Sequence, residues 1–124
     1  MECVNLKELT LPSGCYSHAV KAGGFCFLSG QLGLVSGKLV SDDFCTQLRQ
    51  CFMNIKSVCK SVGKSLDDVV KLTVYYVDIA DRTNIDVVSR EFFKNSYPGR
   101  TRVVVSALSY DAKVEVDCIV SLVK

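Results

Sequence analysis

The last quarter of the chain carries two charged residues that could act together in acid–base chemistry. Arg100 opens a predicted strand, and Glu115 stands in the alternating segment that ends the chain. A turn at residues 110–111 would fold these segments into a hairpin and bring the two side chains close. A guanidinium can bind a carboxylate through two hydrogen bonds, and a carboxylate can serve as a general base. A cross-strand ion pair at a sheet edge, with no catalytic role, explains the same two residues.

The few other reactive side chains exclude several classes of catalytic and metal site. His18 is the only histidine, which excludes a two-histidine acid–base pair within one chain and a metal site of three histidines. It follows Cys15 by three residues, so a Cys–His nucleophile is a minor alternative to a hydrogen-bonded or solvent-exposed His18. The sequence has no P-loop, zinc-protease or serine-hydrolase motif. We therefore expect neither a metal nor a cofactor.

The composition of the chain indicates in which cellular compartment it is found and which partners it binds. The seven cysteines are odd in number and include no C-x-x-C pair, which favours reduced thiols over a zinc site, with a disulfide framework as the alternative. No apolar run approaches the roughly 20 residues that span a bilayer, and the first residues do not resemble a signal peptide. These features predict a cytoplasmic protein, with an organelle left open, and no membrane partner. The net charge of +2 disfavours nucleic acid as the main partner.

The elements that must position these residues follow from the spacing of apolar side chains. From Phe44 to Val62 they recur every three or four residues, which predicts a helix over 42–62 with Ser41 as N-cap and Gly63 as its stop. A second helix is predicted over 83–95. Strands are predicted over residues 17–22, 25–29, 38–40, 69–77, 102–107 and 114–122.

This order of elements predicts one α+β domain over residues 1–124. Both helices would pack on one face of a single sheet. The other face would then lack a cover, and an uncovered apolar face favours self-association.

Several segments together resemble the YjgF/RidA family, which is also described as L-PSP endoribonuclease-like. Residues 98–103, 106–108 and 114–116 resemble its C-terminal signature. Further likenesses lie at residues 14–17 (G-x-Y turn), 27–31 (S-G-Q strand end), 47–55 (Q-x6-N-I/V helix), 70–75 (central strand) and 90–93 (second helix). The resemblance extends from about residue 12 to residue 124.

The resemblance implies a chorismate-mutase-like α+β fold with one mixed sheet of about six strands and two helices. It also implies a homotrimer with active sites in clefts between subunits. The family's deaminases hydrolyse imine and enamine acids, of the 2-aminoacrylate and 2-aminocrotonate type, to 2-keto acids and ammonia without a cofactor. Arg100 would then bind the substrate carboxylate, Glu115 would activate water, and Tyr16 and Ser29 would line the cleft.

Two departures from the family pattern leave the substrate open. Arg102 stands where the deaminases often have Cys, and Asp86 stands where Asn is frequent. A second guanidinium could strengthen anion binding or crowd the site, and a carboxylate cannot donate the hydrogen bond of an amide. We count both among the expected substrate-binding residues. The alternatives are a non-catalytic small-acid-binding or stress-related module of the same fold, and an endoribonuclease or translation inhibitor.

Overall fold

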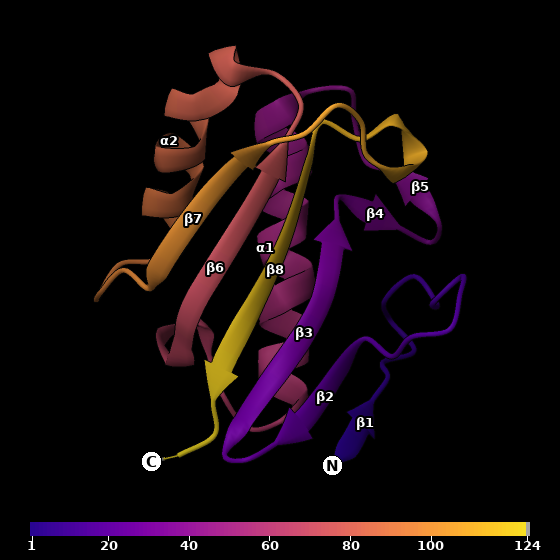
Figure 1. The fold of residues 1–124 in the computed structure, drawn as a ribbon, viewed down its shortest axis with the longest axis vertical. Helices are drawn as coiled ribbons and strands as arrows, with labels where there is room; N and C mark the ends of the chain where they lie inside the picture. The colour runs from indigo at the N-terminus through magenta and orange to yellow at the C-terminus, as the bar shows by residue number, and fades with distance from the viewer. Residues whose placement is uncertain (124) are drawn as a thin grey trace.

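The structure, a computed structural model, describes residues 1–123 and contains one large sheet covered on one side by two helices (Figure 1). The six strands lie in the order β1-β2-β3-β8-β6-β7. They are β1 (Glu2–Val4), β2 (Ala19–Ala22), β3 (Phe25–Leu32), β6 (Val69–Tyr76), β7 (Gly99–Val104) and β8 (Val114–Ser121). The helices are α1 (Phe44–Ser61) and α2 (Arg82–Phe92), and a small hairpin joins β4 (Leu34–Val35) to β5 (Lys38–Leu39). The predicted α+β architecture is confirmed.

The order of the strands corrects one sequence-based prediction. β6 pairs in parallel with β7 and antiparallel with β8, so it lies between them and no β7–β8 hairpin exists. The connection over residues 105–113 includes the turn η3 (Ser109–Asp111) and passes across the end of β6 (Figure 1). The apolar strand β6 thereby gains a partner on each side, whereas a hairpin would have left it with one.

The first helix shows how local sequence sets its ends. Asp43 is the N-cap, and its carboxylate accepts from the Thr46 amide at 2.9 Å. The prediction of Ser41 as N-cap is therefore wrong by two residues; its hydroxyl instead accepts from the Asp43 amide at 3.0 Å. Gly63 takes a φ of +74°, and this left-handed residue ends the helix as predicted.

The second helix and the strand after it begin and end earlier than predicted. α2 ends at Phe92 because Phe93 adopts an extended backbone and places its ring 5.4 Å from that of Phe52 in the core. β7 begins at Gly99, which pairs with Lys71 of β6. β1 was not predicted, because its three residues carry no apolar alternation.

The two faces of the sheet differ sharply in exposure. Along β8, Val114, Val116, Cys118 and Val120 are buried beneath the helices, while the residues between them face the other way. That open face exposes apolar side chains, including Phe25 at 39% and Phe27 at 44%. Among the described residues, no helix is both long and apolar enough to cross a membrane.

Candidate functional site

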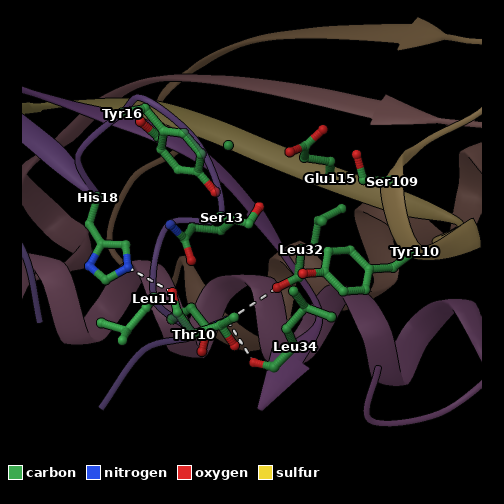
Figure 2. Close-up of a pocket in the computed structure, with 14 residues that line it drawn as sticks. Thr10, Leu11, Ser13, Tyr16, His18, Leu32, Leu34, Ser109, Tyr110 and Glu115 are labelled. Carbon is green, nitrogen blue, oxygen red and sulfur yellow. Dashed lines mark hydrogen bonds between the residues drawn. The ribbon is translucent and has the colours of Figure 1, made fainter. Parts of the chain in front are cut away.

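A cavity of about 410 Å³ lies beside the start of β8, where β3 and the first loop of the chain meet. Figure 2 shows the rings of Tyr16 and Tyr110 and the carboxylate of Glu115 around it. Three of the residues expected from the sequence line this cavity: Tyr16, Ser29 and Glu115. The structure therefore groups these three within one chain.

Glu115 is the acid–base candidate of this cavity. Its neighbours Val114 and Val116 are buried under the helices, so the alternation of β8 turns Glu115 to the opposite, open face. Burial raises the pKa of the Glu115 carboxyl, and the nearby charge of Asp117 raises it further. Among residues 1–123 its carboxylate has no hydrogen-bond or ion-pair partner. A half-buried carboxylate of this kind can accept a proton from a bound water.

Gly30 makes room for that carboxylate. The pairing of β3 with β8 shifts register between Leu28 and Gln31, which places Gly30 in an irregular stretch. A Cβ at position 30 would lie 2.8 Å from Cδ of Glu115, closer than atoms can pack. The glycine is therefore required for the observed position of the Glu115 side chain.

Ser29 and Tyr16 occupy the other side of the cavity. The Ser29 hydroxyl donates to the Ser17 carbonyl at 2.6 Å, which leaves its oxygen free to accept but not to donate. Tyr16 is 52% exposed and follows a tight turn in which its amide donates to the Gly14 carbonyl at 3.0 Å. Its ring leans over the cavity and does not pack in the core (Figure 2).

His18 lines the same cavity but is held in place by the backbone. Its Nδ1 accepts from the Leu6 amide at 3.0 Å, so its Nε2 carries the proton and donates to the Thr10 carbonyl at 2.8 Å. With both ring nitrogens occupied, His18 anchors the first loop and is not placed to act as a base. This is the hydrogen-bonded alternative considered from the sequence.

Two buried amides of α1 fix the backbone around Glu115, a role the sequence analysis did not assign. Gln47 accepts from the Lys113 amide at 2.9 Å, two residues before Glu115. Asn54 donates to the carbonyls of Leu32 and Leu34, just after Gly30, at 3.1 and 3.2 Å. The sequence does contain a signal for this role: Gln47 and Asn54 lie seven residues apart, about two helical turns, on an otherwise apolar face of the predicted helix.

Arg100 and Asp86 lie at a second cavity, of about 440 Å³, between α2 and the start of β7. Arg100 Nη1 donates to the Asp86 carboxylate at 2.5 Å, and this hydrogen bond lowers the pKa of Asp86. The nearby charge of half-buried Arg102 lowers it further. In this chain the carboxylate at position 86 thus serves as the partner of the guanidinium.

One chain does not bring Arg100 and Glu115 together, contrary to the hairpin prediction. Arg100 pairs with buried Leu72, which places it on the helix-covered face of the sheet. Glu115 pairs with Tyr75 on the open face, with β6 between the two strands. The two groups therefore belong to separate half-sites on opposite faces of one chain.

The comparison with known proteins assigns the family. The sequence profile of the family described as Endoribonuclease L-PSP matches residues 7–122. A RutC family protein of Pyrococcus horikoshii is 41% identical over 120 residues, which cover 95% of each chain. This chain belongs to the YjgF/RidA family.

Two further YjgF/RidA relatives carry functional names. The 2-iminobutanoate/2-iminopropanoate deaminase of Dermatophagoides farinae is 35% identical over 111 residues, covering 88% of this chain and 87% of that one. The chloroplastic Reactive Intermediate Deaminase A of Arabidopsis thaliana is 35% identical over 123 residues, covering 98% of this chain and 66% of that one. Since one relative is chloroplastic by name, the cytoplasmic location expected for this chain stays a prediction.

Solved YjgF/RidA structures share the whole fold. RidA from the Antarctic bacterium Psychrobacter sp. superposes with a TM-score of 0.92 at 34% identity, covering 98% of this chain and 99% of that one. E. coli TdcF with bound serine superposes with a TM-score of 0.91 at 28% identity, covering 98% of each.

The cysteines of this YjgF/RidA chain are all free thiols. Four of them are buried, namely Cys26, Cys51, Cys59 and Cys118. Burial raises the pKa of the Cys59 thiol to about 12, which keeps it protonated and unreactive. Among residues 1–123, no group of three or more His, Cys, Asp and Glu side chains could hold a metal ion.

Proposed function

We propose that this YjgF/RidA protein hydrolyses small 2-imino acids to 2-keto acids and ammonia. The observation that carries the proposal is Glu115, a half-buried carboxylate with a raised pKa and no partner among the described residues, set above Gly30 in a cavity with Tyr16 and Ser29. The names of two deaminase relatives support the same reaction.

The reaction needs a positioned water and a base. In the protonated imine the carbon is already electrophilic, and Glu115 takes a proton from water as the oxygen bonds to that carbon. The C=N double bond becomes a single bond to an amine. Proton transfer to the nitrogen and loss of the hydroxyl proton then break the C–N bond, which releases ammonia and leaves the 2-keto acid. General-base catalysis of this kind typically contributes about 10²–10⁴ in rate.

The complete site is proposed to form between two chains of a homotrimer. Arg100 of one subunit would bind the substrate carboxylate, and Glu115, Tyr16 and Ser29 of its neighbour would face the imine carbon. The placement of Arg100 and Glu115 on opposite faces of one chain supports this, since neither half-site contains both groups. The exposed rings of Phe25 and Phe27 also support an assembly that covers the open face.

The proposal is tested by generating 2-aminoacrylate in situ with a dehydratase and measuring release of the keto acid. Arg100→Ala should abolish the acceleration, and Glu115→Gln should reduce it about 10²-fold or more. Arg82→Ala and Glu8→Gln, which remove the same charges from exposed positions, serve as matched controls. A wild-type protein that accelerates hydrolysis of no small imino acid would end the proposal.

The shared site has its own experiment. Arg100→Ala chains should be inactive alone and Glu115→Gln chains nearly so, but the two should regain activity when unfolded and refolded together, because mixed trimers restore some intact sites. If each site lay within one chain, mixing would restore nothing.

A small-acid-binding module without catalysis is the second candidate. The second guanidinium, Arg102, favours it, because its charge lies near Asp86 and strengthens anion binding without adding a group that activates water. That candidate requires keto acids to bind without any acceleration of imine hydrolysis.

A further inference from the structure

The cavity between α2 and β7 combines an apolar floor with unpaired hydrogen-bond donors. Leu72 and Phe93 form the floor and are almost fully buried. Ser89, Arg90 and Arg100 line the same cavity. Pockets of this composition bind small ligands whose polar ends are matched by a few fixed groups.

Ser89 gives the first indication of a ligand. The residue is only 6% exposed, and its hydroxyl has no hydrogen-bond partner among the described residues. A serine inside a helix commonly donates to the carbonyl four residues earlier, but Ser89 does not. A buried hydroxyl left unpaired is destabilising, and an acceptor entering the cavity would satisfy it.

The charges around the cavity give the second indication. Arg100 pairs with Asp86, and Arg90 lines the same cavity. The charges of these two residues and of nearby Arg102 all lower the pKa of Asp86, so one carboxylate faces an excess of two positive charges. The Asp86 carboxylate accepts a hydrogen bond from Nη1 of Arg100. Among residues 1–123, this is the only hydrogen bond that the Arg100 side chain makes. The remaining donors of Arg100 are therefore available for a second carboxylate. Arg90 forms no ion pair with any described residue.

We propose that this cavity binds the distal carboxylate of a dicarboxylic 2-imino acid. Arg100 holds the carboxylate next to the imine, while Arg90 and the Ser89 hydroxyl hold the distal one. A second carboxylate offsets one more of the excess positive charges than a monocarboxylate can, whether or not the imine nitrogen is protonated. The inference rests on the proposed function and names its substrate class.

The test measures binding and so does not depend on turnover. In calorimetric titrations, 2-oxoglutarate should bind the wild-type protein about a hundredfold tighter than 2-oxobutyrate, because Arg90 and Ser89 each add one hydrogen bond to the distal carboxylate, worth about tenfold apiece. Ser89→Ala and Arg90→Gln should each reduce this ratio about tenfold, whereas Lys94→Gln, which removes an exposed cation just beyond α2, should keep it. Equal binding of the two acids, or a ratio unchanged in both variants, overturns the proposal.

Stability without ligand provides a second criterion. Because the Ser89 hydroxyl has no partner, Ser89→Ala should leave the Tm unchanged or raise it. A fall in Tm would show that the hydroxyl is already satisfied within the protein and would remove Ser89 from the proposal.

The outcome separates this inference from the proposed function. A dicarboxylate preference without imine hydrolysis supports the subsite and rejects the deaminase. Imine hydrolysis with no such preference rejects the subsite and leaves the deaminase standing.

Discussion

Replacing Gly30 by alanine should disable Glu115 while leaving the fold intact. The new Cβ would lie 2.8 Å from Cδ of Glu115, whereas ordinary contacts begin near 3.4 Å. The carboxyl group must therefore move by at least about 0.6 Å. Displacements approaching 1 Å at a reacting group can lower the rate about 10²-fold. We expect kcat/KM for 2-aminoacrylate hydrolysis to fall by about that factor.

The stability of the fold should change little in Gly30→Ala, because the group that must move, the Glu115 carboxyl, is the end of a flexible side chain. Alanine also reduces the entropy of the unfolded chain, so Gly30→Ala should change the free energy of unfolding by less than about 1 kcal/mol. Gly33→Ala is the matched control. Its Cβ would lie 2.7 Å from the Gln47 carbonyl oxygen, which is rigid helix backbone, and we expect a loss of about 1–3 kcal/mol.

The assay pairs keto-acid release with urea denaturation and includes a double variant. Once Glu115 is Gln, the carboxylate that Gly30→Ala displaces no longer exists, so adding Gly30→Ala should cause little further loss of activity. The reasoning is refuted if Gly30→Ala keeps wild-type activity. It is also refuted if the losses from the two substitutions multiply in full.

Burial and hydrogen bonding lead to four further expected outcomes. Because the folded pKa of Glu115 is raised, kcat/KM should fall as the pH drops through that pKa. The folded state binds the Glu115 proton more tightly than the unfolded chain does, so the wild type should lose stability relative to Glu115→Gln as the pH rises toward the folded pKa of Glu115. The free energies of unfolding of these two proteins, measured with urea, should converge below about pH 4, where Glu115 is protonated in both states. Asn54→Ala leaves two backbone carbonyls without their donor and should cost at least about 2 kcal/mol; a loss below 1 kcal/mol would contradict the assigned role. In thiol-reagent assays Cys3 and Cys15, which are exposed, should react in the folded protein, whereas Cys59 should react only after unfolding.

Local patterns in the sequence were sufficient for most elements. The spacing of apolar residues from Phe44 to Val62 identified α1, because helical periodicity is visible within a short stretch of sequence. The alternation after Val114 identified β8 and correctly separated its two faces. The strand order was not accessible in this way. A turn signal at residues 110–111 predicts a hairpin, but the pairing of β6 with two partners depends on contacts distant in sequence.

The site was only partly accessible from the sequence. The residue pattern singled out Glu115, and the resemblance to the YjgF/RidA family added Tyr16 and Ser29. These three residues do share a cavity. The steric role of Gly30 depends on a close approach between β3 and β8 that no local pattern encodes. The unpaired hydroxyl of Ser89 is likewise invisible in sequence, because a serine on a helix usually finds a local acceptor.

Because Arg100 and Glu115 lie on opposite faces of the sheet, the specific activity should depend on the enzyme concentration. Under the proposed arrangement a dissociated chain holds two incomplete halves, so specific activity must decline on dilution even while each chain stays folded. A loss of turnover in dilute samples with an unchanged far-UV spectrum would then report dissociation and not denaturation.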